Sequence, residues 1–471
     1  MEDDEYNRAL GAARRLAEDY LDGLRERPVA RDVDPNALAA ALDEPLPEQG
    51  CDPAEALDEW WRRAEPGIVA SPGPRFFGFV NGGATPAALA GDWLASALDQ
   101  NAGLWLCSPA AVETEAVVLR WLKELFGLPA AWEGGITSGA TMANLIGLAA
   151  ARQWVAARLG FDAAEDGLAG QAPIRVLSSS EIHASAIKAL GVLGIGRASL
   201  RKVAARDGAI DLERFRIALA DTQAPVIVVG NAGEVNSGSF DDLGALAEIC
   251  AGHAPGAWLH VDAAFGLFAA LAPRHAHLLR GIERADSVAA DGHKWLNVPY
   301  DCGFAFVRDA EALRGAFRSS AAYLAVEQPV WNPSSHVPES SRRFRALALW
   351  CTLKAHGRAG IRAIVERGIA NAAEFAAWVA VEQGLTLMSP ATLNIVCFRL
   401  APADRDENAA DDLNRRAVRA LQADGRVFVS GTVWAGRAAI RAAFDNWMTD
   451  AHDVAILKQA VADIRDRLLE P

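Results

Sequence analysis

The chain has 471 residues, of which 51% are hydrophobic and 23% are charged, a balance typical of soluble globular proteins. Its formal net charge of −14, with no lysine- or arginine-rich block to offset it, argues against binding to nucleic acid. The apolar runs are interrupted by charged residues and the N-terminus is acidic, so we expect neither a membrane span nor a signal peptide.

Six cysteines are scattered along the chain without any C-x-x-C spacing. This pattern predicts a cytoplasmic protein rather than a disulfide framework or a zinc site. No H-E-x-x-H motif occurs among the nine histidines, so we expect no metal centre.

In chain order, an amphipathic helix over residues 3–26 is expected first, followed by short helical stretches up to about residue 66. Helical segments then alternate with short apolar runs as far as about residue 310. The predicted strands are 173–180, 224–233, 257–265 and 303–309, and the predicted helices are 109–126, 139–159 and 241–252. Continuous apolar strands with intervening helices predict an α/β fold with a mostly parallel sheet covered on both faces.

A long helical stretch around 341–381 begins the C-terminal part of the chain. It is followed by predicted strands at 393–400, 426–431 and 438–444 and by a helix near 408–423, which together suggest a small α+β domain. We therefore expect three segments, listed in chain order: a helical N-terminal segment (1–82), a large domain (83–345) and a small domain (346–471).

Three polar features lie where strands end, the place where ligands gather in open α/β sheets. Asp262 ends one strand, residues 136–145 carry small residues into a helix start that suits a phosphate, and His183 opens another helix. Each feature alone also has a structural explanation, as a loop carboxylate, an ordinary helix cap or a structural histidine.

Lys294 favours a functional explanation of these three features over a structural one. The chain has 46 basic residues but only six lysines, and this one lies between His293 and Trp295. Partial desolvation there would favour the neutral amine that forms a Schiff base, which arginine cannot form. Lysine, aspartate, a phosphate-type helix start and a histidine together are the set that pyridoxal phosphate needs.

In these motifs the chain resembles the pyridoxal-dependent group II amino-acid decarboxylases, which have the aspartate-aminotransferase-like type I fold. The resemblance runs over most of the chain. Residues 76–115 resemble the family's N-terminal region, and "TSGATMANL", "EIHASAIKAL", "NSGSFDD", "LHVDAAFG", "ADSVAADGHKWLNVPYDCG" and "SSRRFRALALW" follow in family order. The resemblance implies that the chain releases CO2 and an amine from an L-amino acid. It also implies a homodimer whose active sites form between subunits.

The resemblance also implies a role for particular residues. Lys294 would carry pyridoxal 5'-phosphate as a Schiff base, Asp262 would pair with the ring nitrogen, His183 would stack on the ring and Ala264 would pack against its other face. The residues implied around the phosphate are Ala140, Thr141, Asp291 and His293.

The sequence departs from the family pattern at positions that could change the outcome of the reaction. In many relatives a mobile loop brings a tyrosine to the substrate as proton donor, but the matching segment, 325–341, contains none. His336 is its only obvious acid and is expected to be either that donor or a solvated loop histidine. Tyr300 is expected to lie behind the lysine. Val235 and Gly82 stand where relatives often have threonine and a polar residue.

The missing tyrosine leaves three readings open: a decarboxylase, an aldehyde synthase whose intermediate reacts with oxygen, or a catalytically quiet homologue. Retention of the lysine, aspartate and histidine together argues against the third. Phe77, Phe79 and Trp105 lie in the region that lines the substrate pocket in relatives, which favours an aromatic or apolar substrate. Arg75 could instead bind an acidic one, and the aromatics could simply pack a dimer interface.

Overall fold

The computed structural model describes residues 2–318, 331–402 and 406–469, which divide into two compact units. The small unit consists of Met1–Asn81, Glu374–Met388 and Cys397–Pro471. The large unit consists of Gly82–Ala373 and Ser389–Val396. No helix among the described residues is long and apolar enough to cross a membrane.

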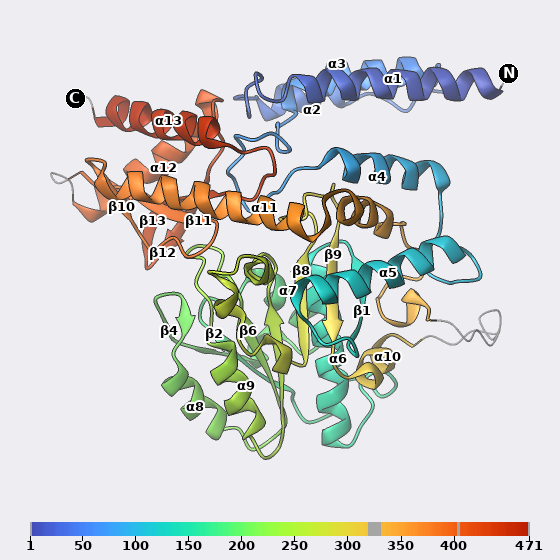
Figure 1. The fold of residues 1–471 in the computed structure, drawn as a ribbon, viewed down its shortest axis with the longest axis vertical. Coiled ribbons are helices and arrows are strands. Elements are labelled where there is room, and N and C mark those ends of the chain that lie inside the picture. Colours follow the sequence, from blue (N-terminus) through green and yellow to red (C-terminus); the bar gives the residue numbers. More distant parts are fainter. Residues whose placement is uncertain (1, 319–330, 403–405, 470–471) are drawn as a thin grey trace. The chain divides into compact units, whose positions relative to one another are not determined.

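A seven-stranded sheet forms the centre of the large unit, in the order β1-β9-β8-β7-β6-β2-β3 (Figure 1). In chain order its strands are β1 (Glu133–Thr137), β2 (Arg175–Ser179), β3 (Leu200–Val203), β6 (Val226–Asn231), β7 (Ala257–Asp262), β8 (Ser287–Asp291) and β9 (Gly303–Val307). The strands from β8 to β3 are parallel, whereas β9 is antiparallel to both of its neighbours. The predicted α/β fold with a mostly parallel sheet is therefore confirmed.

Three of these strands, β1, β3 and β8, are absent from the sequence-based prediction. The sequences of β1 and β8, EGGIT and SVAAD, contain mostly glycine, alanine and polar residues, which have little intrinsic preference for strands. Both are nevertheless buried, because β9 pairs with each of them along its whole length. Tertiary pairing therefore outweighs local preference at the part of the sheet that carries Asp291.

Helices surround this sheet (Figure 1). They are α4 (Pro86–Leu98), α5 (Pro109–Phe126), α6 (Ala140–Leu159), α7 (Ala184–Val192), α8 (Leu212–Ala220), α9 (Leu243–Ala251), α10 (Ala310–Phe317) and the first part of α11 (Ala346–Val381). Helix α6 contacts β7, β8 and β9 and is buried over most of its surface. The absence of a side chain at Gly147 allows the helix to approach the sheet closely, since a side chain there would come within 2.6 Å of the His260 ring. A two-stranded ribbon, β4 (Ala205–Arg206) and β5 (Ala209–Ile210), lies outside the main sheet.

The small unit joins the two ends of the chain. Its N-terminal helices are α1 (Glu2–Asp22), α2 (Pro35–Leu42) and α3 (Pro53–Ala64), and α1 packs on α3. Its four-stranded sheet has the order β10 (Leu385–Leu387), β11 (Ile395–Leu400), β13 (Arg437–Ala443), β12 (Ser430–Trp434), with α12 (Glu407–Asp424) and α13 (Ala451–Leu469) completing it. The predicted strand 426–431 begins later, at Ser430, because Phe428 instead exchanges main-chain hydrogen bonds with Arg75 and Phe77.

The predicted three segments are grouped differently in the structure. Residues 1–81 share a unit with the C-terminal elements, where Phe77 packs on Phe444 with ring centroids 5.0 Å apart. Helix α11, assigned by the prediction to residues 346–471, contributes its residues up to Ala373 to the large unit. The boundary near residue 345 thus falls at the start of a helix rather than between compact units.

Candidate active site

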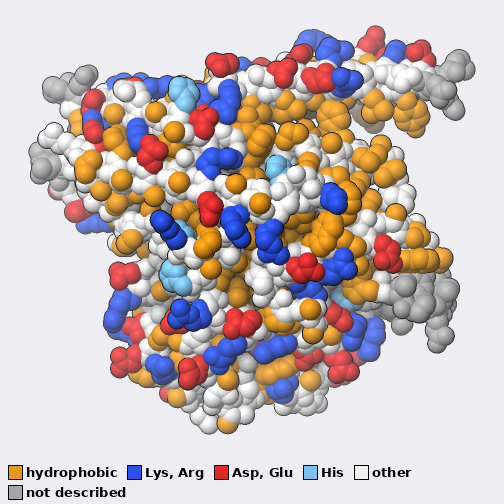
Figure 2. Space-filling view, viewed as in Figure 1, with side chains coloured by type: hydrophobic (Ala, Val, Ile, Leu, Met, Phe, Trp, Pro, Cys, Tyr) orange, Lys and Arg blue, Asp and Glu red, His pale blue; other side chains and the backbone are white. Residues whose placement is uncertain are grey.

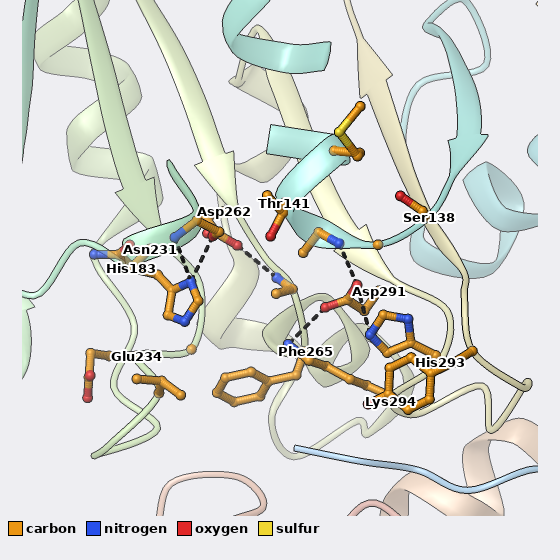
Figure 3. Close-up of a pocket in the computed structure, with 18 of the residues that line it drawn as sticks. Ser138, Thr141, His183, Asn231, Glu234, Asp262, Phe265, Asp291, His293 and Lys294 are labelled. Atoms are coloured by element: carbon orange, nitrogen blue, oxygen red, sulfur yellow. Dashed lines mark hydrogen bonds and ion pairs between the residues drawn. The ribbon is translucent and has the colours of Figure 1, made fainter. Parts of the chain in front are cut away.

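A cavity of about 240 Å³ lies in the large unit at the carboxyl ends of five strands. Asn231, Asp262 and Asp291 end strands β6, β7 and β8, whereas Ser138 and His183 follow β1 and β2, and all five line the cavity (Figure 3). The parallel strands stop at one edge, so residues more than 150 positions apart in the chain meet there.

Asp291 organises one side of the cavity. Its Oδ2 lies 2.9 Å from Lys294 Nζ, and its Oδ1 accepts hydrogen bonds from Ala140 N and, at 3.3 Å, from His293 Nε2. The Cys302 amide donates to His293 Nδ1, so the ring proton must be on Nε2, facing the carboxylate. Burial lowers the pKa of His293, an effect that the Asp291 charge opposes. One carboxylate therefore holds the lysine, the histidine and the start of helix α6.

Asp262 and His183 face the cavity from the adjacent strands. The Asp262 carboxylate is only 6% exposed and accepts hydrogen bonds from Asn144 Nδ2 at 2.8 Å and from Ala264 N at 3.2 Å. His183 Nδ1 lies 2.7 Å from the Ser185 hydroxyl and accepts from the Ser185 amide at 3.2 Å. A buried carboxylate and an oriented imidazole thus stand on the side of the cavity away from Asp291 (Figure 3).

The N-terminus of helix α6 closes the cavity between them. The N-cap residue, Gly139, supplies no side-chain cap, while Asp291 accepts from the first amide, Ala140 N. Gly139 has a φ of +147°, and a side chain there would meet the His293 ring at 2.9 Å, so only glycine fits. Ala140 and Thr141 line the cavity, and the remaining N–H groups of this first turn, together with the helix dipole, make it a suitable site for a phosphate.

Comparison with known proteins agrees with this geometry. The pyridoxal-dependent decarboxylase conserved domain matches residues 35–401. The chain belongs to this family. An aromatic-L-amino-acid decarboxylase of Bacillus atrophaeus is 31% identical over 90% of this chain and 88% of its own length. A phenylacetaldehyde synthase of Arabidopsis thaliana is 29% identical over 93% of this chain and 91% of its own. The crystal structure of Oryza sativa TDC with PLP and tryptamine has a TM-score of 0.92 and 29% identity over 99% of both chains.

This pyridoxal-dependent decarboxylase is a carboxy-lyase with pyridoxal 5'-phosphate as its cofactor, and the cavity suits that group. It combines a primary amine, a buried carboxylate and a helix N-terminus, which match the aldehyde, the ring nitrogen and the phosphate. Asn231 Nδ2 is buried without a hydrogen-bond partner among the described residues, as expected of a group that meets a ligand. Among those residues no group of three His, Cys, Asp or Glu side chains could hold a metal ion.

Of the catalytic and cofactor-binding residues predicted from the sequence, the structure brings all but one to this cavity. The exception is His336, which is 3% exposed and lies with its Nε2 2.8 Å from the Glu133 carboxylate at the amino end of β1. Its Nδ1 lies 3.0 Å from the Asn332 carbonyl oxygen, which can only accept a hydrogen bond. It is therefore a buried histidine rather than a solvated one, and its part in proton transfer stays a prediction. Residues 325–330, the beginning of the predicted loop, lie outside the described residues.

Tyr300 is the residue that the sequence placed wrongly. It lines the cavity rather than lying behind the lysine, and its ring centroid is 4.3 Å from that of His293. The chain turns back after Lys294, and Gly292 N donates to Cys302 O, which brings Tyr300 over the histidine. The backbone at Gly82 also touches this turn, since a side chain there would come within 1.7 Å of the Lys294 carbonyl oxygen. This close approach explains why no polar residue stands at position 82.

The residues expected to select the substrate do not line this cavity. Arg75 donates to the carbonyl oxygens of Arg25, Arg27 and Arg426, so its guanidinium is committed to main-chain groups of the small unit. The expectation that it binds an acidic substrate is not supported by these contacts. Phe77 is 1% exposed and belongs to the core of the small unit.

Proposed function

We propose that this chain decarboxylates an aromatic L-amino acid to the corresponding amine and CO2. The main support is the cavity in which Lys294, Asp262 and His183 meet beside the N-terminus of helix α6. The choice of an aromatic side chain is supported by relatives named aromatic-L-amino-acid, tryptophan and tyrosine decarboxylase, which match this chain over nine-tenths of its length or more.

Each cavity residue has a proposed task. The Lys294 amine, held 2.9 Å from Asp291, forms the bond to the cofactor, and the buried Asp262 carboxylate pairs with the ring nitrogen. His183 and Ala264 contact the two ring faces. The residues proposed at the phosphate are Ala140, Thr141, Asp291 and His293. When bound, the cofactor withdraws electrons from the substrate α-carbon and so stabilises the charge left by departing CO2.

Two residues compete as the donor that returns a proton to the α-carbon. His336 was expected from its segment, but it is held by Glu133 at the far end of β1. Tyr300 lines the cavity beside Lys294 and carries the same kind of hydroxyl as the loop tyrosine of relatives. The position of Tyr300 makes it the better-supported donor within one chain.

A second outcome, oxidative conversion of the amino acid to an aldehyde, remains the alternative function. It is favoured by two observations: residues 331–341 contain no tyrosine, and a phenylacetaldehyde synthase is among the similar proteins. If protonation of the α-carbon is slow, molecular oxygen and water can be consumed instead, and the products are then aldehyde, CO2, ammonia and hydrogen peroxide.

The active form is proposed to be a cytoplasmic homodimer. Large hydrophobic side chains are exposed on the N-terminal segment, including Tyr6, Leu10, Leu46 and Trp60. Figure 2 shows hydrophobic side chains gathered along one edge of these helices. A monomer rarely exposes such a surface, so a second subunit would cover it. All six cysteines are free thiols, which suits the cytoplasm.

The test is a panel of the twenty amino acids with the purified, cofactor-loaded protein, measuring CO2, amine and oxygen uptake. We expect CO2 and amine in equal amounts, fastest with phenylalanine, tyrosine or tryptophan, and little oxygen consumed. Fastest turnover of an acidic amino acid would overturn the aromatic assignment, and oxygen uptake equal to CO2 release would establish the aldehyde outcome.

A further inference from the structure

A chain of hydrogen bonds runs through the core of the large unit and ends at Asp262. Its side chains lie on strands β7 and β8 and helix α6, and in order they are Trp258, Ser287, His260, Asn144 and Asp262. The four links measure 2.9, 2.8, 2.8 and 2.8 Å. A branch leads from Asn144 Nδ2 to the Ser185 hydroxyl at 3.0 Å and from there to His183 Nδ1 at 2.7 Å. One amide is therefore connected to both groups that face the cavity.

The chemistry of the two ends fixes the direction of every hydrogen. The Asp262 carboxylate can only accept, so the Asn144 amide hydrogens face Asp262 and Ser185, and Asn144 Oδ1 accepts from His260 Nε2. In the neutral ring His260 Nδ1 is then the acceptor, so the Ser287 hydroxyl donates to it, and the Ser287 oxygen accepts from the Trp258 indole. Asn144 thus presents donors, and not its oxygen, to the carboxylate.

The branch fixes the second cavity group in the same way. The Ser185 oxygen accepts from Asn144, so its hydroxyl hydrogen is available for His183 Nδ1, which also accepts from the Ser185 amide. His183 therefore carries its proton on Nε2. The Asn144 amide thus supplies a donor to Asp262, and its bond to the Ser185 hydroxyl agrees with the tautomer of His183 that the Ser185 amide sets.

The burial of these side chains indicates that their hydrogen-bonded arrangement is a fixed part of the core. Asn144, His260, Ser287 and Trp258 are fully buried, in a core where apolar side chains would need no partners. Burial also lowers the pKa of His260 to about 4, against the opposing charge of Asp262, so the ring stays neutral and its Nδ1 remains an acceptor near neutral pH. Among the described residues Asn144 is the one side chain that donates to Asp262.

We infer that Asn144, oriented by His260, is the positioning residue that aims the Asp262 carboxylate at the nitrogen of the cofactor ring. This inference rests on the proposed role of Asp262 and adds the group that sets its position. Without the Asn144 donor the carboxylate would keep only the Ala264 amide and could turn within the cavity. A weakened contact with the ring nitrogen is the specific consequence, distinct from a general loss of stability.

The test compares two ligands of the cofactor-free protein: pyridoxal phosphate and its 1-deaza analogue, in which a C–H group replaces the ring nitrogen. Both retain the aldehyde and the phosphate, so the ratio of their Kd values reports the contact between Asp262 and the nitrogen. The wild type should bind pyridoxal phosphate more tightly. In Asn144→Asp, which is isosteric but sets an oxygen against Asp262, this preference should fall at least tenfold.

A second pair of variants acts from the other side of Asn144. His260→Leu removes the group that orients the amide and should also lower the ratio, although position 260 does not contact Asp262. His260→Gln retains an N–H donor and should recover part of the preference. The matched control is Asn414→Asp in helix α12, where a buried asparagine bonds only main-chain groups of Leu400 and Ala410; its ratio should equal that of the wild type.

The outcomes separate this inference from the proposed function. An unchanged ratio in Asn144→Asp overturns the inference, since the residue would then be structural only. If that variant does not fold, the two His260 variants decide. Equal ratios of the two Kd values in His260→Leu and His260→Gln would then overturn the inference. If the wild type binds neither ligand, the proposed function fails, whereas tight binding with an unaltered ratio leaves that function intact.

Discussion

The two ends of strand β1 carry polar clusters of opposite character. At the amino end Glu133 lies 2.8 Å from both Arg314 and His336, so these side chains satisfy one another. At the carboxyl end Asp291 pairs with Lys294, but the lysine amine and the first turn of α6 still face a cavity. Both ends contain paired charges, but the cavity described above lies at the carboxyl end, where the parallel strands stop. Charge pairing alone therefore does not identify an active site.

Replacing Lys294 should abolish the activity of the cluster at the carboxyl end of β1. Lys294→Ala removes the amine that can form a Schiff base, so we expect no detectable decarboxylation and no visible absorbance band after addition of pyridoxal phosphate. Lys188→Ala, at an exposed position outside the cavity, is the control and should behave like the wild type. Borohydride reduction that labels another lysine would contradict the assignment.

Asp262→Asn should cost at least 100-fold in kcat, because a neutral amide cannot keep the ring nitrogen protonated. The absorbance band should persist, since Lys294 remains. Steady-state kinetics and absorbance spectra measure the two effects separately. Activity within a few fold of the wild type would show that this carboxylate is structural.

Substituting the two candidate proton donors compares the two ends of β1 directly. Tyr300→Phe should slow amine formation about tenfold and raise the share of aldehyde and peroxide, because it removes the hydroxyl from the cavity wall. His336→Phe should mainly loosen the segment held by Glu133 and change the product ratio little. The reverse ranking, measured by amine and peroxide yields, would make His336 the donor.

The last prediction concerns stability in acid and leaves activity at neutral pH aside. Burial lowers the pKa of His260 from 6.5 to about 4, so between these values the unfolded chain binds a proton that the folded chain does not. The free energy of unfolding should therefore fall as the pH drops through this window, by on the order of 3 kcal/mol from this residue. Burial raises the pKa of Asp241 to about 6, which works in the opposite direction.

The His260→Gln variant isolates the histidine contribution because it retains Asp241. Urea unfolding of the cofactor-free protein at pH 7 and pH 4.5 should show a smaller acid loss in the variant than in the wild type. Equal losses in the two proteins would mean that His260 takes up its proton without unfolding the core.

Local patterns in the sequence were sufficient for the fold class and for singling out Lys294, Asp262 and His183, whereas Ala264, Asp291 and His293 were implied by the family resemblance. Continuous apolar runs ending in polar residues placed Asp262 and His183 at strand ends, and the isolated Lys294 indicated Schiff-base chemistry. These features were readable because strand periodicity, helix starts and the chemistry of a lysine depend on neighbouring residues. Strands β1 and β8 were missed because their glycine- and alanine-rich sequences become strands only through pairing with β9.

Only the tertiary structure decided which side chains meet. The link from Asn144 to His260 joins positions 116 apart in the chain, and Tyr300 reaches the cavity through a turn whose direction no local pattern reveals. His336 and Arg75 were plausible functional residues until their partners, Glu133 and main-chain carbonyl groups, were visible. The physical reason is common to all four: hydrogen bonds act over about 3 Å, and the strand order and helix packing determine which distant residues come that close.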